Sequence, residues 1–145
     1  MPKEASLKRM SSFSQLGGEL SLYKLLIVDD EKWVRDSLRN IMKETCMPFT
    51  IVNEYDQVKD ALDWLSSHQV DLVLIDINML YRDGGNWIVQ LIEEHAECKV
   101  VLMSVYSDFE YVRHAERYGV NEYLFKPIEY EELELCLQRF LRKKE

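Results

Sequence analysis

The chain has 145 residues and a mass of 17.3 kDa, the size of one domain with one hydrophobic core. Its 18 lysines and arginines against 26 acidic residues give a net charge of −8, so direct nucleic-acid binding is not expected. With 47% hydrophobic residues the chain is expected to fold, but its apolar runs are far shorter than the ~20 residues of a membrane span. Three widely spaced cysteines, and no apolar segment after the first lysines, favour a reduced, cytoplasmic protein.

The start of the chain differs in composition from the rest. It mixes serine, lysine and glutamate with the pair Gly17-Gly18, and its scattered apolar residues suggest no more than a helical turn. We therefore predict an N-terminal extension or expression remnant at 1–22 and a single folded domain over 23–145.

After the extension, short apolar runs alternate with segments of helical periodicity. The runs predict five strands, at 25–28, 49–52, 72–75, 100–103 and 123–125. Apolar residues at helical spacing predict four helices, around 34–42, 58–65, 87–92 and 133–140, and a less regular segment at 107–118 is predicted to be the fourth of five. Ser107 and Asp108 are expected to cap the fourth helix, and Gly119 to end it. This alternation predicts an α/β fold, a doubly wound five-stranded parallel sheet with five helices.

Polar residues follow four of the predicted strands. The pair Asp29-Asp30 comes after the first, Asp76 after the third, Ser104 after the fourth and Lys126 after the fifth. In an open α/β sheet, ligands bind beyond the carboxyl ends of the strands, where the strand order reverses. If the acid pair is to meet Asp76, the first and third strands must be neighbours, which gives the order 2-1-3-4-5.

The acidic residues of this set favour a divalent cation. Clustered carboxylates repel one another unless a cation offsets them, and oxygen ligands without His or Cys suit Mg²⁺. Such an ion leaves positions for a phosphoryl oxygen, while a lysine and a serine can contact the other oxygens. The sequence has no glycine-rich nucleotide loop, so we expect the phosphoryl group to arrive from another molecule and to be carried by Asp76 as an aspartyl phosphate.

At this point the motifs match a known family. They are Leu-Leu-Ile-Val-Asp-Asp-Glu at 25–31, Asp-Ile-Asn-Met at 76–79, Ser104, and Tyr-Leu-Phe-Lys-Pro at 123–127. Together they resemble the receiver domain of two-component response regulators, which has a flavodoxin-like fold. The resemblance covers about residues 24–142.

Three details refine the resemblance. The segment 106–111, Tyr-Ser-Asp-Phe-Glu-Tyr, is most similar to receivers that precede AraC-type DNA-binding domains. Leu80 stands where the family usually has proline, from which we expect a looser loop after the acceptor. Val105 stands where a small Gly or Ala is usual, from which we expect narrower access to the site.

The resemblance implies roles for the acidic residues. Asp76 would accept a phosphoryl group from a phosphohistidine of a sensor histidine kinase. Asp30, Asp76 and the backbone carbonyl of Asn78 would bind Mg²⁺ directly, and Asp29 would act largely through water. The chain would then be a signalling domain and not an enzyme, limited to its own phosphorylation and dephosphorylation.

The resemblance also implies a switch. Lys126 would pair with the phosphate, Ser104 would turn its hydroxyl toward a phosphoryl oxygen, and Tyr123 would rotate inward as Ser104 moves. The fourth helix, fifth strand and fifth helix would form the output face, through which the chain would self-associate. If the chain is a fragment, a DNA-binding domain would follow Glu145.

Two other functions stay open. The departures at Leu80 and Val105 leave room for an interaction module that keeps the fold but works without phosphorylation. An aspartyl-phosphate phosphatase would also combine an acidic nucleophile with Mg²⁺. Such enzymes usually have a second acid two residues after the nucleophile, where this chain has Asn78, so this alternative is the weaker one.

Several nearby residues receive a simpler interpretation. Arg82 is interpreted as a solvated turn residue, and His68, His95 and His114 as surface residues of helices. The β propensity of Tyr123 is enough to explain it as an ordinary half-buried strand aromatic.

Overall fold

The computed structural model describes residues 22–82, 87–105, 108–120 and 122–144. Its strands are β1 (Tyr23–Val28), β2 (Phe49–Tyr55), β3 (Leu72–Asp76), β4 (Lys99–Ser104) and β5 (Tyr123–Phe125). Its helices are α2 (Lys32–Glu44), α3 (Val58–Leu65), α4 (Ile77–Leu80), α5 (Trp87–Glu94), α6 (Phe109–Glu116) and α7 (Tyr130–Lys144). All five predicted strands and all five predicted helices are present. Apart from Leu22, the predicted extension lies outside the described residues and stays a prediction.

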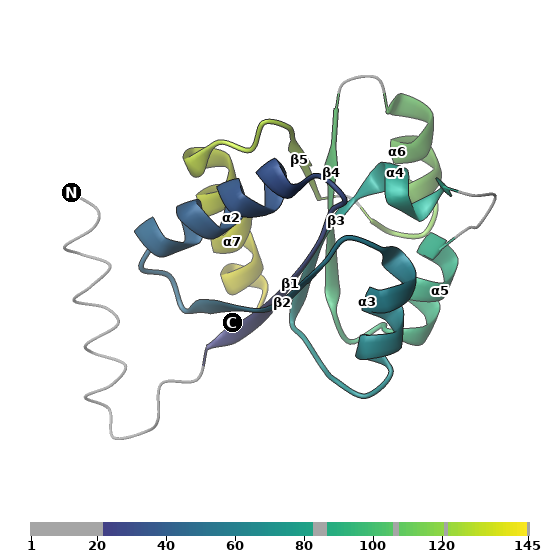
Figure 1. Cartoon of the computed structure of the whole chain (residues 1–145), viewed down its shortest axis with the longest axis horizontal. Helices are drawn as coiled ribbons and strands as arrows, with labels where there is room; N and C mark the ends of the chain where they lie inside the picture. The colour runs from purple at the N-terminus through teal and green to yellow at the C-terminus, as the bar shows by residue number, and fades with distance from the viewer. Residues whose placement is uncertain (1–21, 83–86, 106–107, 121, 145) are drawn as a thin grey trace.

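The strands form one parallel sheet in the order β2-β1-β3-β4-β5, as predicted (Figure 1). The three central strands carry the continuous apolar runs of the sequence, and their apolar side chains are almost completely buried. Parallel strands that are covered on both faces require this composition. The sheet order also makes β1 and β3 direct neighbours, which the grouping of the acidic residues requires.

Alternate residues of the central strands face two separate helical layers. Leu25 and Ile27 of β1 pack in the cluster that includes side chains of α2 and α7. Leu26 and Val28 pack in the other cluster, with side chains of α3, α4 and α5. Figure 1 shows α2 and α7 on one side of the sheet and the remaining helices on the other. Each fully buried side chain of this size contributes about 1.5–3 kcal/mol, so the two layers hold the strand ends in place.

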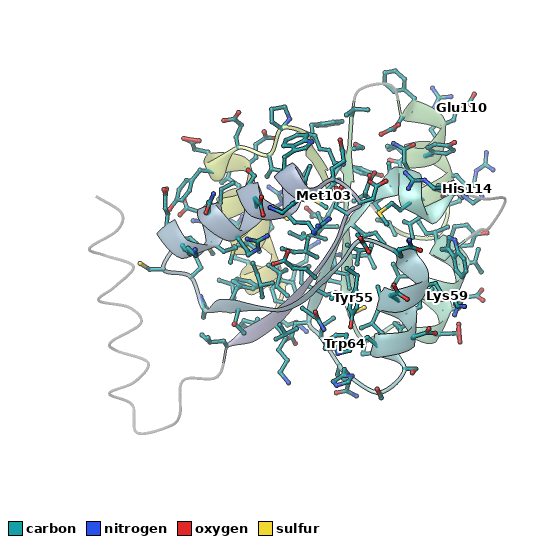
Figure 2. The ribbon with its side chains drawn as sticks, in the orientation of Figure 1. Tyr55, Lys59, Trp64, Met103, Glu110 and His114 are labelled. Carbon is teal, nitrogen blue, oxygen red and sulfur yellow. The ribbon has the colours of Figure 1, made fainter. Side chains whose placement is uncertain are left out.

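Strand β2 at the sheet edge is only half-buried, and aromatic packing supports its end. The rings of Tyr55 and Trp64 lie 6.2 Å apart, and both residues are labelled in Figure 2 beside α3. Trp64 also stacks on His68 at 4.3 Å. Among the described residues, no helix is long and apolar enough to cross a membrane.

The structure adds a sixth helix to the five that were predicted. Helix α4 is a single turn that begins directly after Asp76, whose carboxylate accepts a hydrogen bond from the Asn78 N–H at 3.0 Å. Three of its four side chains, Ile77, Met79 and Leu80, are buried. A four-residue turn is too short to show helical periodicity, so the prediction of five helices missed it.

Candidate functional site

The carboxyl ends of four neighbouring strands bring the predicted site residues to one edge of the sheet. In the strand register Val28 lies beside Ile75, and Ser104 lies beside Phe125. The residues that follow these positions therefore approach one another. One carboxylate oxygen from each of four acidic residues lies within 4.8 Å of the others, and these are Asp29, Asp30, Glu31 and Asp76.

Lys126 places a buried ammonium among these carboxylates. Its Nζ lies 2.8 Å from Asp29 Oδ2, 2.9 Å from Glu31 Oε1 and 3.2 Å from Asp76 Oδ2. The side chains of Lys126 and Asp76 are each only 5% exposed, and that of Asp29 is fully buried. One ammonium therefore faces three carboxylates, of which those of Asp29 and Asp76 are buried and that of Glu31 is about half exposed.

The protonation equilibria reflect this imbalance. Burial raises the pKa of Asp29 and of Asp76, and the nearby carboxylates add to both shifts. Burial alone would lower the pKa of Lys126, but the contacts of its ammonium with the carboxylates of Asp29 and Glu31 outweigh burial and raise this pKa. The hydrogen bond from Lys126 in turn lowers the pKa of Glu31. Lys126 is therefore charged at neutral pH and leaves negative charge uncompensated.

The outer side of the acidic group opens into a pocket of about 440 Å³. Its lining residues are Asp30, Glu31, Asp76, Asn78, Tyr81, Arg82 and Tyr111. Arg82 Nη1 donates a hydrogen bond to Asp30 Oδ2 at 2.7 Å, and the two side chains are 46% and 34% exposed. Arg82 is exposed, as expected of a solvated turn residue, but that interpretation missed the ion pair of its guanidinium with a predicted metal ligand.

The sequence matches the response regulator receiver domain model over residues 25–138, which is most of the chain. The chain belongs to this family. It is 32% identical to the transcriptional regulatory protein HptR of Staphylococcus aureus over 121 residues, which are 83% of this chain and 47% of HptR. The chain thus spans about half the length of the curated relatives it matches.

Solved structures agree with the assignment. The receiver domain of AraT, a response regulator from Geobacillus stearothermophilus, matches with a TM-score of 0.72 and 28% identity, over 84% of this chain and 95% of that one. A two-component transcriptional regulator AraC from Clostridium phytofermentans matches with a TM-score of 0.70 and 30% identity, over 83% and 93%. The predicted resemblance to receivers of AraC-type regulators is confirmed.

The residues of this receiver fit a hard divalent cation. All four ligand atoms of the acidic group are oxygens, and the surplus negative charge at Asp29 and Asp76 would be offset by a cation beside them. Asn78, the remaining predicted ligand, lines the same pocket. Its backbone carbonyl accepts a hydrogen bond from the Tyr81 N–H at 3.2 Å, which leaves one lone pair of that oxygen for another partner.

The two predicted switch residues of the receiver are not joined to each other. Ser104 is 1% exposed, and its hydroxyl has no hydrogen-bond partner among the described residues. The Tyr123 hydroxyl donates to the Val120 carbonyl at 3.0 Å, and burial raises the pKa of Tyr123 to about 12. A buried hydroxyl without a partner is available to a group that enters the site.

Asp108 differs from its expected role as a helix cap. Asp108 stands at the first position before α6, but its side chain does not cap that helix. Its carboxylate instead accepts the Val105 N–H at 2.9 Å and lies 3.4 Å from Asn78 Nδ2, so it ties the β4–α6 loop to α4. Leu80 is fully buried, so packing holds it in the single turn of α4. A looser loop after Asp76 stays a prediction.

Sequence reasoning missed an aromatic contact at the wall of the pocket. The Tyr81 hydroxyl lies 2.6 Å from His114 Nδ1, and its ring stacks on Tyr111 with centroids 4.7 Å apart. Figure 2 labels His114 on α6. The surface interpretation is wrong for His95, which is buried, and His114 is half-buried in this contact. An isolated histidine in a polar helix gives no sequence signal for such a partner.

Proposed function

We propose that this receiver accepts a phosphoryl group on Asp76 from a phosphohistidine of a sensor histidine kinase, in the presence of Mg²⁺. The observation that supports this most is the position of Lys126, whose ammonium touches Asp76 and Asp29 beside an open, acid-lined pocket. An acidic side chain that is held against a lysine and lines a pocket is arranged to become an aspartyl phosphate, which is an acyl phosphate.

The transfer exchanges one bond for another. An Asp76 carboxylate oxygen attacks the phosphorus, the phosphorus–nitrogen bond of the phosphohistidine breaks, and the imidazole leaves with the electron pair. Bound Mg²⁺ would neutralise charge on the phosphoryl oxygens, with Asp30, Asp76 and Asn78 as direct ligands and Asp29 acting through water. Lys126 already lies 3.2 Å from the acceptor and would pair with a phosphoryl oxygen.

Phosphorylation would then change the conformation of the output face. Ser104 is buried without a hydrogen-bond partner among the described residues, so its hydroxyl is free to turn toward the phosphoryl group. Tyr123 would follow by leaving the Val120 carbonyl. A phosphoryl group adds a charge of about −1.5 to −2, which is enough to bias a loop between two arrangements.

The output we propose is regulated transcription. HptR and the AraC-type relative are transcriptional regulators, and this chain corresponds to about half of HptR. A DNA-binding domain after Glu145 would supply the nucleic-acid contacts that an acidic receiver lacks. Self-association through α6, β5 and α7 would couple phosphorylation to that domain.

The decisive experiment measures phosphoryl incorporation by intact mass after incubation with acetyl phosphate and Mg²⁺. Wild type and the control Asp63→Asn, an exposed acid of α3, should each gain one phosphoryl group, and Asp76→Asn should gain none. Undiminished labelling of Asp76→Asn would show that another residue is the acceptor. Continuous turnover of phosphate esters would favour a phosphatase, and no labelling of wild type would favour a phosphorylation-independent module.

Self-association is tested separately by sedimentation. Beryllofluoride, which mimics a phosphoryl group on a carboxylate, should increase the sedimenting mass of wild type but not of Asp76→Asn. An unchanged mass would remove the dimer switch without affecting the acceptor assignment.

A further inference from the structure

The pair between Arg82 and Asp30 joins two segments that are 52 residues apart in the sequence, across the mouth of the acidic pocket. We propose that Arg82 is an internal counter-cation that competes with Mg²⁺ for Asp30, so that binding the metal requires this ion pair to break. The inference rests on the proposed metal site, to which it adds a residue that sets metal affinity.

The competition follows from where the two cations would sit. Asp30 contributes an oxygen to the acidic group, and its Oδ2 is held by the Arg82 guanidinium at 2.7 Å. Mg²⁺ would approach a carboxylate oxygen to about 2.0–2.1 Å. A divalent ion and a guanidinium on one small carboxylate would lie within a few ångströms of each other, where like charges repel strongly. The two cations therefore exclude each other at Asp30.

Arg82, and not Lys126, is the cation that can leave. The Lys126 side chain is 5% exposed and lies within 3.2 Å of three carboxylates, so its release would strand buried charges. The Arg82 side chain is 46% exposed at the pocket rim, so water can solvate its guanidinium after release. The exchange thus replaces a single positive charge on Asp30 by a double one while the buried ammonium stays in place.

The exchange has a measurable consequence for affinity. If a fraction of the metal-free molecules has Asp30 paired with Arg82, the apparent affinity for Mg²⁺ is reduced in proportion to the molecules that remain competent. Removal of the guanidinium should therefore tighten metal binding. Exposed ion pairs of this kind are weak, so the expected gain is roughly two- to fivefold.

The test compares the Mg²⁺ dissociation constants of four chains, wild type and three variants, by calorimetry and by tryptophan fluorescence. Trp33 is a suitable reporter because its Nε1 donates to Glu31 Oε2 at 3.1 Å, beside the site. Arg82→Gln should bind Mg²⁺ roughly two- to fivefold more tightly than wild type. The matched control Lys32→Gln removes the same charge from an exposed side chain that pairs with Asp36, and should change affinity less than half as much. Arg82→Lys should fall between wild type and Arg82→Gln.

Several outcomes would overturn the proposed exchange of Arg82 for Mg²⁺ at Asp30. Equal affinities of wild type and Arg82→Gln would overturn the exchange, as would equal gains in Arg82→Gln and Lys32→Gln, since the effect would then be long-range charge alone. Weaker binding by Arg82→Gln would also overturn it and make Arg82 a support of the site. If wild type binds no Mg²⁺, the proposed metal site fails and the exchange fails with it. Thermal melts of each variant without metal establish that the chains compared are folded.

Discussion

The two halves of the acidic site use the same chemistry in opposite environments. The inner half, Asp29, Asp76 and Lys126, is at most 5% exposed at its side chains. The outer half, Asp30 and Arg82, is about one-third and one-half exposed. Both are carboxylates paired with a cation, but only the outer half has water available to either partner once the pair separates.

This difference separates a permanent part of the site from an exchangeable one. Loss of one partner from a buried pair leaves an uncompensated charge and costs about 3–5 kcal/mol. Loss of one partner from an exposed pair costs about 0–1 kcal/mol, because water replaces it. The inner half therefore keeps its geometry before and after ligands bind, while the outer half can trade cations at little energetic cost.

The largest expected effect comes from breaking the inner half. Lys126→Met should lower the free energy of unfolding at pH 7 by about 3 kcal/mol, since Asp29 and Asp76 lose their shared ammonium. Arg82→Met, the outer counterpart, should lower it by less than about 1 kcal/mol. Urea denaturation without Mg²⁺ measures both. The difference between the two losses of unfolding free energy should become smaller at acidic pH, because protonation of the buried carboxyl groups removes their uncompensated negative charges. Equal losses at pH 7 would mean that the two halves are energetically alike.

The next effect is on metal binding by the outer half. Asp30→Ala removes a proposed direct ligand and should weaken Mg²⁺ binding at least ~10-fold, because even the loss of a residue that only supports a ligand commonly costs about that much. Asp36→Ala, an exposed acid that pairs with Lys32 and Arg39, serves as the control. The midpoint of thermal unfolding with and without Mg²⁺ gives the comparison. A Mg²⁺-induced rise in Asp30→Ala as large as in wild type would contradict the ligand role.

A smaller effect is expected when one negative charge of the inner half is removed. A carboxyl whose pKa is raised on folding binds its proton more tightly in the folded state, so stability falls as the pH rises from 3.8, the ordinary value, through the raised pKa. Without Mg²⁺, Asp76→Asn should therefore be more stable than wild type at pH 7, by on the order of 1 kcal/mol. The gain should vanish below about pH 4 and shrink when Mg²⁺ is added. A gain that is constant with pH would show that ionisation of Asp76 is not its cause.

The smallest effect concerns access to both halves. Val105 is 41% exposed directly after Ser104, and its β-branched side chain is stiff, so it should crowd a small phosphodonor. Val105→Gly should speed labelling of Asp76 by acetyl phosphate, and spontaneous loss of the phosphoryl group, by roughly threefold or less, under about 0.7 kcal/mol. Transfer from a partner kinase should change less, because interface contacts position its phosphohistidine. Matched rates of labelling and loss in variant and parent would exclude Val105 as the gate.

Much of the fold and the inner site could be predicted because both depend on where strands end. The apolar runs of β1, β3 and β4 mark buried strands, and the residue type changes abruptly at Asp29, Asp76 and Ser104. Parallel strands bring their carboxyl ends to one edge of the sheet, whatever the conformation of the loops. The sheet order was predicted from the need to bring acidic residues together, and the structure confirms it.

The partners of loop residues could not be predicted in this way. From the sequence, Arg82 is interpreted as a solvated turn residue, yet its guanidinium pairs with Asp30. Asp108 is expected to cap a helix, yet its carboxylate accepts the Val105 N–H. Glu31 is visible only as the third acid of a run, with no sign that it reaches Lys126 at 2.9 Å. Helix α4 could not be predicted either, because four residues are too few to show helical periodicity. It lies just before Arg82 in the chain.

The sequence by itself determined the α/β alternation, the buried strands and the acidic and basic residues at their ends, because hydrophobic periodicity is a local property that the chain carries at every position. Only the tertiary structure decided which cation each carboxylate meets. Lys126 is buried among the acidic residues at the strand ends, and Arg82 is about half exposed at the pocket. The exposure of an ion pair depends on everything packed around it, and that exposure is what makes one pair permanent and the other exchangeable.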